Sequence, residues 1–161
     1  DAFAAKLNGS QNGRILDVGA GTGLVGQRLN SHGYSNIDGL DISPEMLEVA
    51  RAKGCYENMI EGDLLSRLLI PDNTYNYIIS AGTFTHGHVG ASALDELLRI
   101  SKPGALFCIA INSTYFSSTG FEKKFHQLSK KITQLEFITV QIYFEGDHTD
   151  GEGVVAIFRS V

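Results

Sequence analysis

Cysteine is scarce in this sequence, and no metal-ligand pattern is present. Only Cys55 and Cys108 occur, and neither belongs to a CxxC pair or lies at Cys/His ligand spacing. We therefore expect no metal site. Cys108 lies in the apolar run at 106–111, which predicts a buried thiol. Two unpaired cysteines also fit a reducing compartment.

Long apolar runs and basic arms are missing as well. No apolar run approaches the ~20 residues that span a bilayer, and the first residues lack the features of a signal peptide. We therefore expect a cytoplasmic protein with no membrane partner. The net charge of −5 and the lack of an arginine-rich arm argue against a nucleic-acid surface. Asp1 is not an initiator methionine, which leaves open whether residues precede it.

Strand and helix signals alternate along the first two-thirds of the chain. The predicted strands are 14–18, 37–41, 56–60, 75–80, 105–111, 136–144 and 153–159. Ser43 followed by Pro44 is typical of a helix start. Because alternating strands and helices build a parallel sheet with helices on both faces, we predict a doubly wound α/β fold. The last two strands should form an antiparallel hairpin, and residues 1–161 should form a single domain.

The stretch Asp17-Val18-Gly19-Ala20-Gly21-Thr22-Gly23 follows the first predicted strand and leads into a helical pattern. Glycines at such a turn let the backbone come close to a ligand. A dinucleotide would present its anionic pyrophosphate here, which the Asp17 carboxylate would repel. S-adenosylmethionine (SAM) instead presents an ammonium and a sulfonium group, which a carboxylate attracts. Asp17 therefore favours SAM, although residues 21–26 also satisfy GxGxxG.

Further polar residues follow the next predicted strands. Asp41 can accept hydrogen bonds from both ribose hydroxyls, and Ile42 can pack on the adenine face. Asp63 can accept a hydrogen bond from the adenine amino group, while the Leu64 amide donates one to a ring nitrogen. A single acid at such a place is ordinarily a loop residue or a helix cap, but three at successive strand ends indicate a cofactor site. The predicted cofactor-binding residues are Asp17, Gly19, Ala20, Gly21, Gly23, Asp41, Ile42, Asp63, Leu64 and Ser80.

These motifs resemble those of the class I SAM-dependent methyltransferases. The matching pieces are ILDVGAGTG (15–23), GLDISPEML (39–47), EGD (61–63) and ELLRISKPG (96–104). Residues 76–104, with THGHVG at 85–90, further resemble the methyltransferase-like proteins named after the Williams–Beuren syndrome region. The resemblance implies a Rossmann-like, seven-stranded and mostly parallel sheet of order 3-2-1-4-5-7-6, with strand seven antiparallel. It also implies methyl transfer from SAM, leaving S-adenosylhomocysteine.

Two features depart from that family. Asn76 stands where an acid is usual, and we expect it to cap or orient a loop. Many relatives carry extra N-terminal helices that close over SAM, whereas about thirteen residues precede the first strand here. Whether such helices are missing or trimmed is left open.

The methyl acceptor is not identified by any motif. The loop after the fourth strand lacks Asn/Asp-Pro-Pro-Tyr/Phe and Pro-Cys, which argues against methylation of nucleic-acid bases. It offers His86 and His88 as candidate catalytic bases, because a neutral imidazole has a pKa near ~6.5. Alternatively, one histidine orients the loop and the other is solvated. The segment 113–118 is either a wall of the acceptor pocket or an ordinary strand-to-helix connection.

Three functions remain for comparison. The first is a methyltransferase that acts on a small molecule by direct displacement, where much of the catalysis comes from positioning the acceptor. The second is a non-catalytic SAM-binding module or an activating partner of another methyltransferase. The third is a nicotinamide-dependent oxidoreductase, which Asp17 and the lack of a Tyr-x-x-x-Lys pair disfavour. A homo-oligomer is left open.

Overall fold

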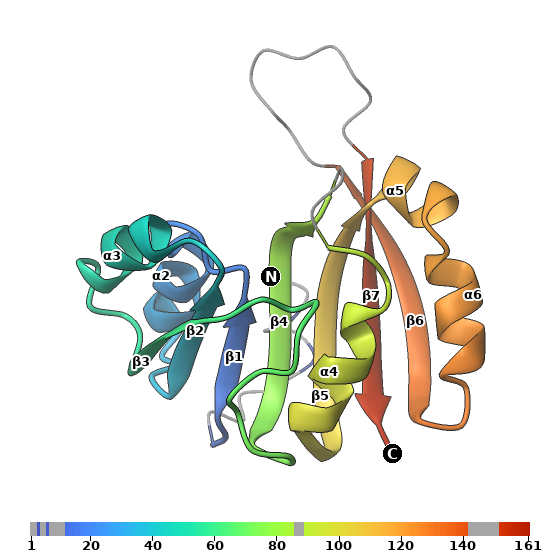
Figure 1. Cartoon of the computed structure of the whole chain (residues 1–161), viewed down its shortest axis with the longest axis horizontal. Helices are drawn as coiled ribbons and strands as arrows, with labels where there is room; N and C mark the ends of the chain where they lie inside the picture. Colours follow the sequence, from blue (N-terminus) through green and yellow to red (C-terminus); the bar gives the residue numbers. More distant parts are fainter. Residues whose placement is uncertain (1–2, 4–5, 7–11, 86–88, 142–151) are drawn as a thin grey trace.

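The computed structural model describes residues 3, 6, 12–85, 89–141 and 152–161. Within them seven strands form one sheet of order β3-β2-β1-β4-β5-β7-β6 (Figure 1). The strands are β1 (Ile15–Val18), β2 (Ile37–Asp41), β3 (Asn58–Glu61), β4 (Tyr75–Phe84), β5 (Ser101–Asn112), β6 (Ile132–Gln141) and β7 (Glu152–Ser160). The pairs among β1 to β5 are parallel, and β7 runs antiparallel to β5 and β6. The predicted order and the antiparallel strand seven are confirmed.

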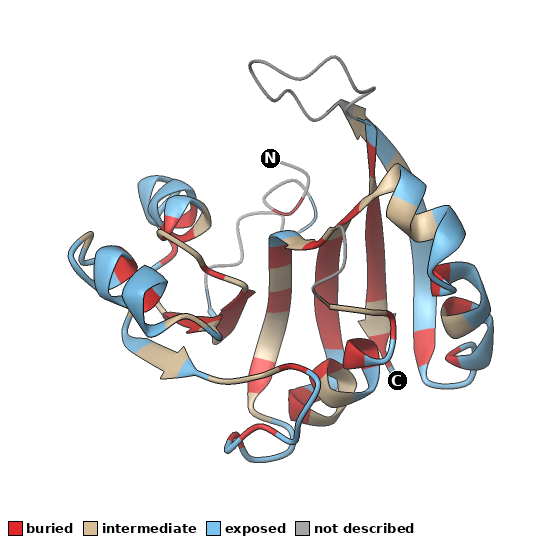
Figure 2. Ribbon diagram, turned by 45° about the horizontal axis from the view of Figure 1, so that its top comes forward, coloured by how far each residue is buried: buried red, intermediate tan, exposed pale blue. Residues whose placement is uncertain are grey.

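Helices cover both faces of this sheet. They are α2 (Leu24–Ser31), α3 (Pro44–Arg51), α4 (Ala93–Ile100), α5 (Ser113–Ser118) and α6 (Phe121–Gln127). Side chains alternate along β5, so Leu106 packs in a cluster with Leu29 of α2, whereas Phe107 packs in another with Leu97 of α4. The buried residues accordingly concentrate on the central strands and on the helix sides that face them (Figure 2). No helix in the described part of the chain is long and apolar enough to cross a membrane.

The parallel register brings the carboxyl ends of β1, β2, β3 and β4 to one edge of the sheet. Asp17 pairs with Gly39, Val18 pairs with Ser80, and Asp41 pairs with Glu61. The polar residues that the sequence places after different strands are therefore neighbours in space. In doubly wound sheets this edge is where ligands bind.

Several boundaries differ from the predicted ones. β5 begins at Ser101 rather than at 105, because Ser101 already pairs with Tyr75 before a register shift accommodates residues 102–104. β6 begins at Ile132 rather than at 136, and its pairing with β7 shifts between Thr133 and Glu136. Asn76 orients a loop, as predicted, since its Oδ1 accepts hydrogen bonds from Arg14 N and Lys102 Nζ.

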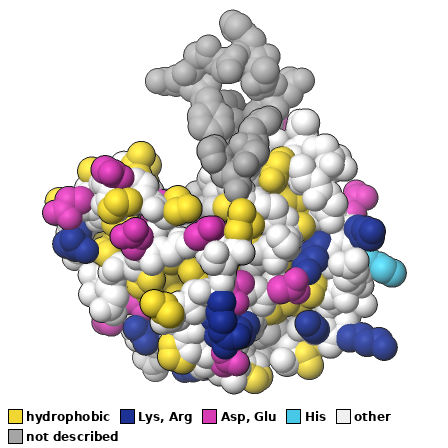
Figure 3. Space-filling view, viewed as in Figure 1, with side chains coloured by type: hydrophobic (Ala, Val, Ile, Leu, Met, Phe, Trp, Pro, Cys, Tyr) yellow, Lys and Arg dark blue, Asp and Glu magenta, His cyan; other side chains and the backbone are white. Residues whose placement is uncertain are grey.

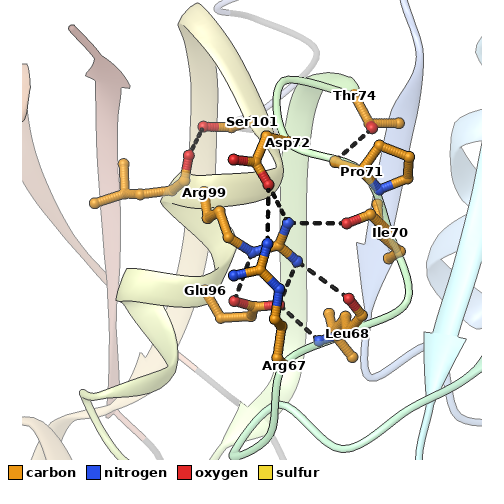
Figure 4. A network of polar contacts seen from close by, with 10 residues as sticks. Arg67, Leu68, Ile70, Pro71, Asp72, Thr74, Glu96, Arg99 and Ser101 are labelled. Carbon is orange, nitrogen blue, oxygen red and sulfur yellow. Dashed lines mark hydrogen bonds and ion pairs between the residues drawn. The ribbon is translucent and has the colours of Figure 1, made fainter.

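The segment between β3 and β4 is held against α4 by Arg99 and Glu96 (Figure 4). Arg99 donates to the carbonyl oxygens of Leu68 and Ile70 at 3.2 and 2.9 Å, and Glu96 Oε1 accepts from Leu68 N at 2.7 Å. The two side chains are only 16% and 15% exposed. The hydrogen bond from Arg99 holds the pKa of Glu96 below its ordinary value. This pair therefore fixes a segment that has little regular structure of its own.

Replacing Arg99 with alanine should destabilise the protein, because Glu96 and two carbonyl oxygens would lose a partly buried donor. We expect the free energy of unfolding to fall by at least about 2 kcal/mol in a urea titration. Arg51→Ala is the matched control: Arg51 also pairs with a glutamate three residues earlier, but with side chains 61% and 75% exposed. Its loss should stay below about 0.5 kcal/mol. Equal losses in the two variants would contradict this role of Arg99.

Candidate functional site

A cavity of about 960 Å³ opens at the carboxyl ends of β1 to β4. Residues within 19–25, 40–46 and 62–65 line it, together with 81–83 and Val89. The predicted cofactor residues that line it are Gly19, Ala20, Gly21, Asp41, Ile42, Asp63 and Leu64. The remaining three, Asp17, Gly23 and Ser80, are buried and are not among its lining residues. His86 and His88 lie outside the described residues.

The glycine turn follows β1 at the floor of this cavity. Gly19 has a φ of +69°, and a Cβ built there would lie 1.8 Å from Thr83 Oγ1, so no side chain fits. Gly21 has a φ of +51°, but its Cβ would meet only the Gly19 carbonyl oxygen, at 4.0 Å. The backbone at Gly21 therefore faces open space. Gly19 lets the turn pack against β4, whereas Gly21 presents bare backbone to the cavity.

Asp41 connects the turn to α3. Its Oδ2 accepts a hydrogen bond from Gly21 N at 2.8 Å, and its Oδ1 accepts one from Ser43 N at 3.0 Å. Ser43 in turn caps α3 by accepting from Met46 N at 3.2 Å. A carboxylate oxygen has two lone pairs, so Asp41 keeps acceptor capacity toward the cavity after both bonds are made.

A further acid and several exposed apolar side chains also line the cavity. Asp63 Oδ1 accepts from Leu65 N at 2.8 Å, which turns the chain just after β3. Leu24, Ile42, Met46 and Leu65 all line the cavity and are exposed. Figure 3 shows hydrophobic side chains gathered over this part of the surface, around α2 and α3. Such a wall suits a flat, partly apolar ligand group.

Asp17 lies behind the turn, with no exposed surface. Its Oδ2 accepts a hydrogen bond from the Tyr56 hydroxyl at 2.7 Å, and its Oδ1 has no partner among the described residues. Burial raises the pKa of Asp17 to about 7, and the nearby Asp41 carboxylate adds to the rise, while the Tyr56 hydrogen bond opposes it. Tyr56 was missed by the sequence analysis, because nothing in the spacing signals a contact across 39 positions.

Ser80 and Thr83 both act on the backbone of β1. Their hydroxyls donate to the Val18 carbonyl oxygen at 2.8 Å each. Ser80 is buried by this contact, whereas Thr83 also lines the cavity. These two bonds tie the end of β4 to the residue that precedes the glycine turn.

The wall near β4 is made of small and apolar residues, Ala81, Gly82, Thr83 and Val89. The segment 113–118 does not line the cavity; it forms α5, whose Tyr115 hydroxyl donates to the Val89 carbonyl oxygen at 3.3 Å. The segment is therefore a short helix between β5 and α6, and it also supports Val89. Within the described residues, no group of three His, Cys, Asp or Glu side chains could hold a metal ion.

Comparisons with known proteins agree with this geometry. The family described as "Methyltransferase domain" matches residues 16–109. Human methyltransferase-like protein 27 is 38% identical over 96 residues, which cover 59% of this chain and 39% of that protein. The ubiquinone/menaquinone biosynthesis C-methyltransferase UbiE of Zymomonas mobilis is 31% identical over 138 residues, which cover 82% of this chain and 55% of that protein. The chain thus spans about two-fifths to half of the length of these relatives.

A solved structure shares the fold. The TehB-like SAM-dependent methyltransferase from Corynebacterium glutamicum superposes with a TM-score of 0.71 at 20% identity. The match covers 99% of this chain and 86% of that one. At this identity the likeness concerns the fold alone.

Replacing Asp17 with asparagine should flatten the dependence of stability on pH. With a pKa of about 7 in the native state against 3.8 ordinarily, the folded protein keeps a proton that the unfolded chain has lost. The free energy of unfolding therefore falls as the pH rises from about 4 to about 7. Asparagine cannot ionise, yet it still accepts the Tyr56 hydrogen bond.

Urea titrations at pH 5 and pH 8 measure this effect. The difference in the free energy of unfolding between the two pH values should be smaller in Asp17→Asn than in the parent protein by at least about 1 kcal/mol. An equal difference in both proteins would show that Asp17 titrates normally.

Proposed function

The chain belongs to the methyltransferase domain family, and we propose that it transfers a methyl group from SAM to a small-molecule acceptor by direct displacement. The observation that carries the proposal is the convergence of three strand-end segments on one cavity. The glycine turn, Asp41 with Ile42, and Asp63 with Leu64 all line it. When bound, SAM supplies an electrophilic methyl group.

The residues present fit this donor. Bare backbone at Gly21 leaves room for a ligand to approach the turn. Asp41 keeps lone pairs for the ribose hydroxyls, and exposed Ile42 offers an apolar surface to the adenine. Asp63 and Leu64 would take the adenine edge. The unpaired oxygen of buried Asp17 would respond to the positive charge of the donor.

The cavity also has room for an acceptor. Its volume of about 960 Å³ is near the upper end of the ~300–1,000 Å³ range of small-molecule sites. The described residues of the wall near β4, Ala81, Gly82, Thr83 and Val89, carry no formal charge, which suits a neutral, partly apolar molecule. The name of the Z. mobilis relative, which refers to quinone biosynthesis, supports an acceptor of this size class.

Catalysis in this proposal rests mainly on positioning. Asp41 and Asp63 are the acids among the described lining residues, and both lie on the donor side. A general base would be needed only if the acceptor must lose a proton, and His86 and His88 stay predictions for that role. We further propose that residues 1–161 act as one cytoplasmic domain, which the two free cysteines support.

A non-catalytic SAM-binding module, or an activating partner of another methyltransferase, is the second candidate. The observation that favours it is the absence of any titratable side chain on the β4 wall of the cavity, within the residues that the structure describes.

Calorimetry tests the donor site. We expect the parent protein to bind SAM and S-adenosylhomocysteine but not NAD. Asp41→Ala should weaken SAM binding at least ~10-fold, because ribose acceptors are lost and the turn is released from α3. Glu61→Ala, an exposed acid at the end of β3 outside the cavity, should bind like the parent. Selective binding of NAD, or unchanged affinity in Asp41→Ala, would overturn the assignment.

Methyl transfer separates the enzyme from the module. The protein is incubated with methyl-labelled SAM and metabolite extracts, and products are analysed by mass spectrometry. We expect a labelled small molecule whose yield falls clearly when Asp41→Ala replaces the parent at the same low SAM concentration. Tight SAM binding without any labelled product across broad extracts would favour the module.

A further inference from the structure

Tyr56 occupies the space that three glycines leave open. A Cβ on Gly26 would lie 2.2 Å from Tyr56 Cζ, and Cβ atoms on Gly23 and Gly39 would lie 3.1 and 3.2 Å from its ring. Gly26 is also the last glycine of the GxGxxG pattern at 21–26. This glycine therefore admits a tyrosine ring from the segment before β3, in a place where the pattern alone suggests helix–strand packing.

The Tyr56 hydroxyl joins two elements of the donor site. It donates to Asp17 Oδ2 at 2.7 Å, and it accepts from Gly26 N at 3.1 Å. Gly26 N is one of the amides in the first turn of α2 that has no acceptor within the helix. The phenol thus satisfies one helix amide and one carboxylate oxygen at the same time, and it leaves Asp17 Oδ1 as the unpaired atom.

We propose that Tyr56 is a positioning residue of the donor site: it fixes the Asp17 carboxylate behind the glycine turn, so that Oδ1 stays free to compensate the positive charge of the bound donor. This inference rests on the proposed function. It adds a residue that no motif of the sequence marks, and it assigns that residue a role through Asp17 rather than by contact with the ligand.

Among the described residues, no positively charged side chain contributes to the pKa of Asp17, and Lys53 acts only on the neighbouring Cys55. Asp41 faces it from the end of β2, Tyr56 and Cys55 face it from the segment before β3, and α2 contributes the Gly26 amide. A cationic ligand that enters the cavity would therefore bring a positive charge that the described residues do not supply to Asp17. It would favour the ionised carboxylate, so donor binding should release a proton from Asp17 to the solvent.

Tyr56 sets the fraction of Asp17 that is already ionised before the ligand binds. Its hydrogen bond to the carboxylate lowers the pKa of Asp17 against the opposing effect of burial. Without the hydroxyl, more Asp17 would be protonated at neutral pH, and more of the binding free energy would go into removing that proton. The loss of affinity should therefore depend on pH, which a purely structural role would not produce.

Isothermal titration calorimetry with S-adenosylhomocysteine tests this coupling, because this ligand keeps the ammonium group and has no transferable methyl. Titrations at pH 7 in two buffers of different ionisation enthalpy give the number of protons released per ligand bound. The α-amino group of the ligand titrates near ~8 in every experiment, so differences between variants isolate Asp17. The parent should release roughly half a proton more than Asp17→Asn.

The decisive variant is Tyr56→Phe, which keeps the ring and removes the hydroxyl. It should release more protons than the parent and bind about fivefold more weakly at pH 7, with the deficit nearly gone at pH 9. Tyr75→Phe is the matched control. Tyr75 donates to another buried carboxylate, Asp38, at 2.9 Å, away from the cavity. It should leave affinity and proton release unchanged.

Three results overturn the inference: equal affinity loss in Tyr56→Phe at pH 7 and pH 9, parental affinity in that variant, or equal proton release by the parent and Asp17→Asn. If Tyr56→Phe does not fold, the comparison of proton release between the parent and Asp17→Asn can still overturn the inference, because it does not use that variant. No binding of the ligand by the parent at any pH is a separate result, and it overturns the proposed function itself.

Discussion

Burying the Asp17 carboxylate between β1 and α2 constrains much of the surrounding structure. A carboxylate without exposed surface needs hydrogen-bond donors, and among the described residues the Tyr56 hydroxyl donates to it, with the Gly26 amide close by. Tyr56 can take that position only because Gly26 has no Cβ. Oδ1 has no partner among the described residues, which is unfavourable for a buried oxygen, and a cation beside the glycine turn would compensate it. Under the proposed function, this locally unfavourable group would serve donor binding, as destabilised groups in functional sites often do.

The same site is supported from its other sides by contacts that do not reach the ligand. Asp41 holds both Gly21 N and the start of α3, so the turn and the helix cannot move independently. Thr83 on β4 donates a hydrogen bond to the Val18 carbonyl oxygen, just before the glycine turn. Arg99 and Glu96 pin the segment that follows Asp63 and Leu64 against α4. Residues on β2, β4 and α4 therefore fix a cavity whose own lining is mostly small or apolar.

Much of this arrangement could be predicted from the sequence, because the fold repeats a strand–helix unit whose ends are marked by glycine, proline and acids. The alternation placed Asp17, Asp41 and Asp63 at neighbouring strand ends, and the resemblance to a known family supplied the strand order. Asp41 ends β2 and reaches the cavity, whereas Asp17 is the third residue of the four-residue β1 and lies behind it. Strand-end position alone does not distinguish these two outcomes, since one residue along a strand reverses the direction of a side chain.

Contacts between distant residues could not be predicted. The sequence predicts that Tyr56 begins a strand and that Arg99 is a charged residue on an amphipathic helix. Their partners are brought near only by the folded sheet, at separations of 39 residues for Tyr56 and up to 31 for Arg99. The methyl acceptor could not be predicted from the sequence either, because the described residues of the wall near β4, Ala81, Gly82, Thr83 and Val89, form no recognisable motif.

Hydrogen–deuterium exchange with and without S-adenosylhomocysteine would show whether the carboxyl ends of β1, β2 and β3 form one donor site. We expect the ligand to slow exchange together in 19–26, 41–46 and 62–66, and to leave residues 130–133, at the start of the edge strand β6, unaffected. Slowing confined to one of these segments, or found only elsewhere in the chain, would contradict a shared donor site.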